Sequence, residues 1–153
     1  MGSWLRRNIS SPWLLATICM VAVIWGNSLV PGAGSSSLSL SVLHAVKSFL
    51  GSLGIPSAWV TNFLIRKAAH MTEYAVLAVL AYHALNAPGT VSWTCVVRSL
   101  ALCALVAAFD ETIQLSVAGR CGAVTDVLID SVGACLGTMI VAGLARVRER
   151  SAR

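Results

Sequence analysis

Charged residues are few in this sequence, and their scarcity excludes a whole class of protein. Asp, Glu, Lys and Arg together make up 11% of the 153 residues, whereas 57% of the residues are hydrophobic. A soluble domain has about 25% charged residues. Together with a mean hydropathy of +0.80, this composition excludes a soluble domain and indicates an integral membrane protein.

Paired cysteine spacings and zinc-ligand motifs are also lacking. The five cysteines are an odd number at scattered positions, and four of them fall in apolar runs: Cys19, Cys95, Cys103, Cys121 and Cys135. A disulfide framework or a zinc site would need paired short spacings. We therefore expect these cysteines to be small buried hydrophobic side chains, and we predict neither a metal nor a cofactor.

Four continuous apolar segments are long enough to cross a bilayer, which takes about 20 helical residues. They lie near residues 12–30, 66–86, 92–116 and 124–146. Because these runs are continuous and do not alternate, we predict helices: an all-α bundle of four transmembrane helices forming one membrane domain over residues 1–153. The first run follows basic residues like a secretory signal, but it is longer than the usual signal core, so we expect it to be retained.

The long connection between the first two spans contains a helical pattern. Apolar residues recur in it at spacings of three and four: Val42, Leu43, Val46, Phe49, Leu50 and Leu53. This pattern predicts an amphipathic helix on the outer membrane surface or over the mouth of the bundle. A partly ordered loop of helix-like composition is the alternative.

Basic residues near the span ends indicate the orientation, because cytoplasmic flanks collect them. With both termini in the cytoplasm, the inner side has Arg6, Arg7, Arg98, Arg146, Arg148, Arg150 and Arg153. The outer side then has Lys47, Arg66, Lys67 and Arg120. The excess inside favours this orientation and also suits an anionic lipid surface rather than a nucleic acid.

Most of the acidic residues lie near the outer ends of the spans. Helical spacing places Lys67, His70, Glu73 or Tyr74, and Leu77 on one face of the second span. On the third span, Asp110 and Gln114 share a face and Glu111 lies beside them. On the fourth span, one face contains Asp126, Asp130, Gly133 and Gly137. Ionisable groups in membranes are costly and usually mark a site. We therefore expect three polar faces to meet in one outward-opening pocket, with the glycine pair allowing close helix contact.

The residue types suggest acid–base and anion-binding chemistry. We predict His70, Glu73, Asp110 and Glu111 as the catalytic, proton-exchanging residues. We predict that five further residues bind or orient the substrate: Lys67, Tyr74, Gln114, Arg120 and Asp126. A histidine among carboxylates would suit Zn, Mn or Fe, but no ligand spacing supports a metal. The alternative is that these charges neutralise one another and only fix the helix register.

The same residues carry a resemblance to a known family. The sequences RKAAHMTEY, DETIQ and GRCGAVTD resemble the VanZ-like signature K-x-x-H-x-x-E-Y, D-E-x-x-Q and G-R with an Asp six residues on. The resemblance covers residues 66–140 and marks Lys67, His70, Glu73, Tyr74, Asp110, Glu111, Gln114, Gly119, Arg120, Asp126 and Gly133. Two positions depart from the pattern: Ala118 stands where the family often has Pro, and Asp130 where it often has Asn.

The resemblance implies a protein of the bacterial plasma membrane linked to resistance against teicoplanin, a lipoglycopeptide that acts at the outer cell surface. It implies neither a fold nor a reaction. We therefore expect membrane lipids as partners, with a lipid-linked cell-wall precursor or a glycopeptide as the target. Three classes of function stay open: an enzyme acting on a lipid-linked envelope substrate, a protein that binds or shields surface targets without chemistry, and a proton-coupled transporter, which the apolar inner halves of the spans disfavour.

Overall fold

The computed structural model describes residues 11–86 and 92–151, and this part of the chain is all-helical. Arg6, Arg7 and Arg153, which the orientation prediction used, lie outside the described residues. The elements in chain order are α2 (Ser11–Leu29), α3 (Gly32–Ser52), α4 (Asn62–Leu85), α5 (Trp93–Leu115) and α6 (Val124–Ser151). The predicted all-α class is therefore confirmed for the described residues.

Among the described helices, three are long and apolar enough to cross a membrane. They cover Pro12–Leu29, Trp93–Leu115 and Val124–Arg148. Helix α4 has 24 residues but is not one of the three, because the charged and polar residues in its first half lower its hydropathy. A fourth spanning helix stays a prediction.

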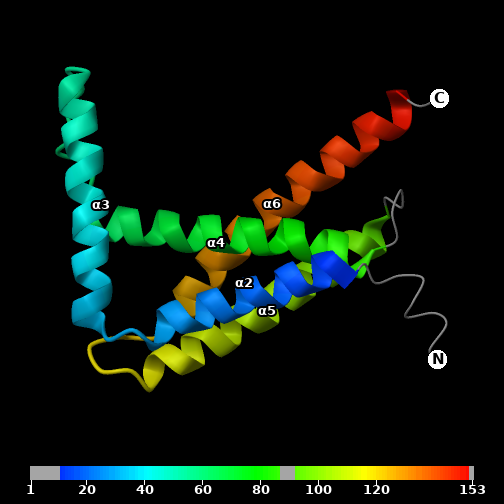
Figure 1. Cartoon of the computed structure of the whole chain (residues 1–153), viewed down its shortest axis with the longest axis horizontal. Helices are drawn as coiled ribbons and strands as arrows, with labels where there is room; N and C mark the ends of the chain where they lie inside the picture. The colour runs from blue at the N-terminus through cyan, green and yellow to red at the C-terminus, as the bar shows by residue number, and fades with distance from the viewer. Residues whose placement is uncertain (1–10, 87–91, 152–153) are drawn as a thin grey trace.

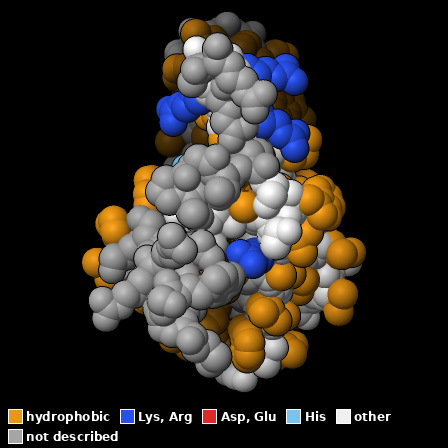
Figure 2. Space-filling model, turned by 90° about the vertical axis from the view of Figure 1, so that its right-hand side faces the viewer, with side chains coloured by type: hydrophobic (Ala, Val, Ile, Leu, Met, Phe, Trp, Pro, Cys, Tyr) orange, Lys and Arg blue, Asp and Glu red, His pale blue; other side chains and the backbone are white. Residues whose placement is uncertain are grey.

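Helix α4 lies in the middle of the bundle, against α2, α5 and α6. Helix α3 runs across the beginning of α4, in a direction different from the other four helices (Figure 1). Helix α2 begins and α6 ends at the opposite end of the molecule. Figure 2, which faces that opposite end, shows Lys and Arg side chains around its top, and a further one among the hydrophobic side chains of its lower part.

The helix ends follow local sequence signals. Pro31 stands between α2 and α3 and is the N-cap residue of α3. Because a proline has no backbone N–H, it cannot continue the hydrogen bonding of a preceding helix, and α2 ends before it at Leu29. The side chain of Thr61 accepts a hydrogen bond from the backbone N–H of Leu64 at the start of α4, over 3.2 Å, which satisfies one free donor of the first turn. Gly54, at φ 69°, follows the end of α3, where the left-handed conformation favours glycine.

Helix α3 is longer than the predicted 42–53 segment, because it includes the serine-rich stretch before it. In that stretch the side chains donate to carbonyls of the preceding turn, as Ser37 does to Gly34 over 2.8 Å and Ser41 to Ser37 over 3.1 Å. These bonds satisfy the hydroxyls inside a helix. The helix therefore begins at Gly32, about three turns before the predicted apolar pattern.

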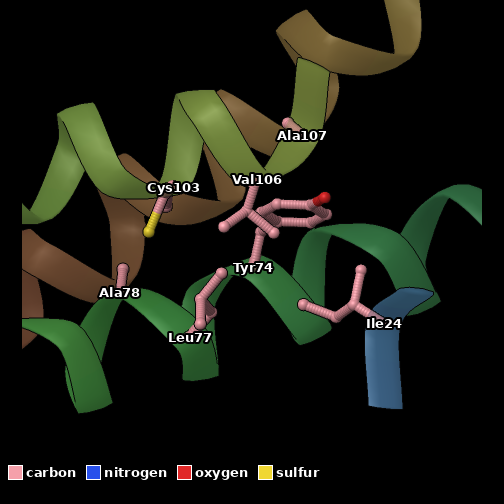
Figure 3. Close-up of a cluster of buried hydrophobic side chains, with 8 residues drawn as sticks. Ile24, Tyr74, Leu77, Ala78, Cys103, Val106 and Ala107 are labelled. Carbon is pink, nitrogen blue, oxygen red and sulfur yellow. The ribbon is translucent and has the colours of Figure 1, made fainter. Parts of the chain in front are cut away.

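The hydrophobic core lies where α2, α4, α5 and α6 meet (Figure 3). Tyr74 and Leu77 of α4 are 0% exposed in it, and Ile24 of α2 is 1% exposed. Cys103 and Val106 reach the same cluster from α5. The apolar core therefore begins on α4 at Tyr74, directly after the polar residues His70 and Glu73.

Glycines of α6 set its distance from α4. A Cβ atom on Gly133 would meet the backbone carbonyl oxygen of Met71, and one on Gly137 would meet that of Ala75. The predicted close contact at this glycine pair is confirmed, since the two backbones touch where the side chains are missing.

The expectation of buried cysteines is only partly right. Cys95 and Cys103 are buried, whereas Cys19, Cys121 and Cys135 are exposed. Cys19 and Cys135 lie on helix surfaces turned away from the bundle, and Cys121 lies in the loop between α5 and α6. Apolar sequence context does not distinguish a core-facing position of a membrane helix from an outward-facing one, and this caused the error.

Candidate functional site

A cavity of about 620 Å³ lies between α2, α3, α4 and the loop that joins α5 to α6. This size falls within the range of about 300–1,000 Å³ found for small-molecule sites. Its polar lining residues are Asn27, Ser28, Ser35, Ser39, Arg66, His70, Thr72, Glu73 and Arg120. The remaining lining residues are apolar, among them Met20, Leu38, Val42, Ile65 and Val76. Charged and apolar side chains therefore line the same cavity.

Helix α4 presents Arg66, His70 and Glu73 to this cavity. Their spacing of four and then three residues returns to the same side after about two turns. The residues of the predicted face, Lys67, His70, Glu73 or Tyr74, and Leu77, differ in their surroundings: His70 and Glu73 line the cavity, Tyr74 and Leu77 lie in the core, and Lys67 pairs with Asp126 of α6.

Glu73 and His70 link the cavity to neighbouring helices. The side-chain amide of Asn27 on α2 donates to Oε1 of Glu73 over 2.9 Å. On the other side, Nδ1 of His70 lies 3.8 Å from Oδ1 of Asp130 on α6. Asp130 is 0% exposed, so His70 stands between the open cavity and a fully buried carboxyl group.

Arg120 holds the end of α2 as well as lining the cavity. Its Nε donates to the carbonyl oxygen of Val30 over 2.9 Å, and its Nη2 donates to that of Asn27 over 2.6 Å. The backbone N–H of Gly32 also donates to the carbonyl of Ala118 in the same loop, over 3.1 Å. These bonds fasten the loop before α6 to the α2–α3 junction and satisfy carbonyls that the end of a helix leaves free.

The electrostatic surroundings of Arg120 are unfavourable for a cation. Burial, and after it the nearby Arg66, lowers the pKa of Arg120 from its ordinary value, while Asp110, Glu111 and Glu73 act in the opposite direction. An arginine stays protonated under these conditions because its ordinary pKa is above about 12. Two cationic guanidinium groups therefore face one cavity.

Three of the predicted residues form a buried layer on α5 and do not line the cavity. Asp110, Glu111 and Gln114 are 0%, 6% and 3% exposed. Nε2 of Gln114 donates to Oδ2 of Asp110 over 3.0 Å and to the hydroxyl of Ser28 over 3.2 Å. Ser28 also lines the cavity, so the hydrogen bond to its hydroxyl joins this layer to the site.

Glu111 supports the beginning of α6. Its Oε2 accepts a hydrogen bond from the backbone N–H of Ala123 over 2.7 Å. A carboxylate at the N-terminus of a helix satisfies a free donor and suits the positive end of the helix dipole. This contact gives Glu111 a structural role at the α5–α6 connection.

Lys67 and Asp126 form an ion pair between α4 and α6. Their side chains are 18% and 20% exposed, so the pair is largely sheltered from solvent. Neither residue lines the cavity. Tyr74 is also separated from it, because its ring is 0% exposed within the hydrophobic core (Figure 3).

Several buried polar atoms near the site have no hydrogen-bond partner among the described residues. They are Nδ1 of His70, the hydroxyl of Tyr74, Oδ1 of Asp110, Oε1 of Glu111 and both carboxyl oxygens of Asp130. Among the same residues, no three His, Cys, Asp or Glu side chains are grouped so that they could hold a metal ion. The polar layer beneath the cavity thus has unused hydrogen-bonding capacity next to His70.

The sequence prediction missed Arg66 and Asn27 as site residues. Arg66 was used only to judge orientation, although its spacing to His70 and Glu73 was a usable signal. Asn27 belongs to α2, outside the motif region; its place at the predicted outer end of the first span brings it to the level of the other polar residues, and its contact with Glu73 makes it part of the site. Tertiary structure therefore adds a first-helix wall and an arginine to the site.

Comparison with known proteins agrees with the motifs. The family model described as VanZ/LLP1 matches residues 13–146, from the start of α2 nearly to the end of α6. Among curated proteins and among solved structures, none matches the chain. The match covers nearly the whole chain and confirms the resemblance of the polar motifs. The chain belongs to the VanZ/LLP1 family.

Proposed function

We propose that this protein acts in the bacterial plasma membrane, where it binds a lipid-linked component of the cell envelope and contributes to resistance against lipoglycopeptides of the teicoplanin type. The carrying observation is the cavity between α2, α3 and α4, which joins charged side chains to apolar walls. A lipid-linked molecule has the same division between a polar headgroup and an apolar chain. Family membership supports the link to resistance.

In this proposal, α4 is a fourth spanning helix. Its polar residues are covered by neighbours instead of facing lipid: α2 contacts Glu73, and α6 contacts Lys67. A helix whose ionisable groups face the inside of a bundle can cross a membrane despite its lower hydropathy. Helix α3 then lies along the membrane surface, with Leu38, Phe49 and other exposed apolar side chains reaching into the lipid.

The proposed orientation has the cavity on the outer side and both termini in the cytoplasm. Arg146, Arg148 and Arg150 are exposed near the end of α6, at the opposite end of the molecule from α3. Positively charged residues collect on the cytoplasmic side. The cavity then faces the compartment where lipoglycopeptides act.

His70 and Glu73 are the residues that would exchange protons with the bound molecule. Both line the cavity, and His70 has a buried carboxyl group behind it. A histidine near a carboxyl group can act as a general acid or base, although the 3.8 Å between Nδ1 of His70 and Oδ1 of Asp130 is longer than a hydrogen bond. Asp110, Glu111, Gln114, Lys67 and Asp126 support the site from outside the cavity.

Binding without chemistry is the second candidate function. It is favoured because the predicted site residues already interact within the protein. Lys67 forms an ion pair with Asp126, and Gln114 donates a hydrogen bond to Asp110. Glu111 accepts a hydrogen bond from the backbone N–H of Ala123, and Arg120 donates to a backbone carbonyl of α2. In this form the charged groups hold the helices, and the protein shields or sequesters its ligand.

One experiment tests the proposal, and variants separate its two forms. The full chain is purified in mild detergent, and native mass spectrometry measures which envelope lipids copurify. We expect a specific lipid in the wild type. The variants His70→Ala and Glu73→Gln are expected to abolish resistance while still inserting and retaining that lipid if chemistry is required. Full resistance in both variants would favour binding alone, and a wild-type protein free of any specific lipid would remove the proposal.

A further inference from the structure

The contacts of Arg66 within the described part of the chain do not explain why a charged residue stands at this position. It lines the cavity from the second turn of α4, and within the described part of the chain it makes no hydrogen bond or ion pair that would neutralise it. The adjacent Lys67, in contrast, is paired with Asp126. A cation in such surroundings is costly unless an anion accompanies it.

Arg120 brings a second guanidinium group to the same cavity. It uses Nε and one N–H of Nη2 for the carbonyls of α2, and a guanidinium group has five N–H donors. Donors therefore remain for a ligand, while the loop and α2 hold the group in position. Arg66 is close enough to lower the pKa of Arg120, so the two cations share one electrostatic environment.

A phosphate group is the anion that best fits two converging arginines. Guanidinium groups bind phosphate oxygens through paired, charge-assisted hydrogen bonds. An anion between two of them attracts both and so offsets the repulsion between the two cations. Glu73 lines the same cavity and would repel a second negative charge, while its carboxylate can accept a hydrogen bond from a hydroxyl or ammonium group. These charges favour a phosphodiester with a donor group over a phosphate monoester.

The apolar part of the cavity is open at its side. Leu38 and Val42 of α3 and Val76 of α4 line it, yet they are 68%, 51% and 44% exposed. Contact with these apolar side chains would not stabilise binding of free phosphate, which has no apolar surface to bury. A hydrocarbon chain that starts at a phosphate in the cavity would contact these side chains and continue into the surrounding lipid.

We infer that the cavity binds a phosphodiester lipid, whose phosphate lies between Arg66 and Arg120 and whose chain lies between α3 and α4. This inference rests on the proposed function and names the chemical class of its ligand. Arg66 becomes a ligand-binding residue, and Arg120 both binds the phosphate and fixes the loop. The buried residues of α5 take no direct part in binding.

The test uses the full chain in detergent micelles and three probes measured by native mass spectrometry. Dioleoylphosphatidylglycerol carries phosphate and chains, dioleoylglycerol carries the same chains without phosphate, and inorganic phosphate has no chain. We expect the first probe to bind at least tenfold more tightly than either of the others. The variant Arg66→Gln should weaken binding of this lipid about tenfold, corresponding to about 1.4 kcal/mol. The variant Arg66→Lys should weaken it less, because lysine keeps the positive charge but lacks the paired N–H donors of the guanidinium group.

Lys47→Gln is the matched control, because it removes the same charge from α3 at a position outside the cavity lining. We expect it to bind like the wild type, and thermal unfolding of each variant in the same detergent checks folding. Equal binding of dioleoylglycerol would overturn the phosphate assignment, and equal binding of inorganic phosphate would overturn the lipid assignment. Unchanged binding in Arg66→Gln would overturn the arginine pair. A specific copurifying lipid without phosphate would overturn this inference but leave the proposed function standing.

Discussion

At the scale of single residues, adjacent positions of α4 have different tasks. Arg66 faces the cavity, whereas Lys67 pairs with Asp126 of α6. Likewise Glu73 bonds Asn27, whereas Tyr74 is buried in the core. Neighbouring residues on a helix point about 100° apart, so a small error of phase exchanges a ligand-binding face for a packing face.

This separation leads to a prediction for the ion pair of Lys67 and Asp126. Lys67→Met should destabilise the protein by about 1–3 kcal/mol, because it leaves a sheltered carboxylate without its partner. Adding Asp126→Leu should recover most of the loss, since both charges are then gone. Thermal unfolding of the two single variants and the double variant in detergent measures this.

The same set of variants also distinguishes a structural pair from a ligand-binding pair. We expect the double variant to keep its bound lipid, because neither residue lines the cavity. Recovery of stability together with complete loss of the lipid would contradict the structural role and return both residues to the binding site.

At this scale the sequence predicted the residue types of the site well but not their neighbours. His70, Glu73 and Arg120 were predicted from spacing and resemblance, and they line the cavity. The bonds from Arg120 to the α2 carbonyls were not predictable, because they join segments that are about 90 residues apart in the chain. No helical period relates such positions.

At the scale of the elements, the pairing of α4 with α6 positions the site. Gly133 and Gly137 allow the two backbones to touch, which brings Asp126 to Lys67 and Asp130 to His70. In a membrane, such close packing takes over the role that hydrophobic burial has in water. The polar contacts between these helices therefore depend on the absence of a Cβ atom at Gly133 and Gly137.

Two glycines of α6 provide a matched test of this dependence. Gly137→Ala would place a methyl group against the carbonyl oxygen of Ala75, whereas Gly143→Ala meets nothing within 4 Å. We expect Gly137→Ala to lower stability by about 1–3 kcal/mol through overpacking. Gly143→Ala should leave stability unchanged or raise it, because alanine favours a helix more than glycine does.

Thermal unfolding in one detergent compares these two variants directly. Equal unfolding temperatures for both would show that close contact between α4 and α6 contributes little to the fold. A lower temperature for Gly143→Ala alone would place the critical contact at the other end of α6.

At the scale of the whole molecule, the cavity and the exposed arginines of α6 lie at opposite ends. The cavity is next to α3 and the loop between α5 and α6, whereas exposed arginines occupy the last turns of α6. Under the proposed topology, in which α4 is a fourth spanning helix, this distribution matches an even number of passages through the membrane. It supplies a direct test of the proposed orientation.

The exposed Cys121, in the loop between α5 and α6, is a natural probe of that orientation. In intact spheroplasts, a membrane-impermeant maleimide should label the wild type at this residue, and Cys121→Ser should remove the labelling. Arg148→Cys, introduced into the Cys121→Ser variant, should be labelled only after the membrane is permeabilised. Cys19 and Cys135 lie on helices in lipid under this proposal, where thiolates form poorly, so they should give little background. The reverse pattern of labelling would invert the proposed topology.

Composition and periodicity by themselves determined that this protein is helical, belongs in a membrane and carries polar groups near one end of its spans. These properties depend on average hydropathy and on residues three or four apart, and both can be read along a chain. Only the tertiary structure decided which polar groups face the cavity, which ones hold helices together, and that α2 and α3 form its remaining walls. The reason is physical: the contacts of Glu73 with Asn27 and of His70 with Asp130 join different helices, and close packing of α4 against α6 sets the rotation at which such groups meet.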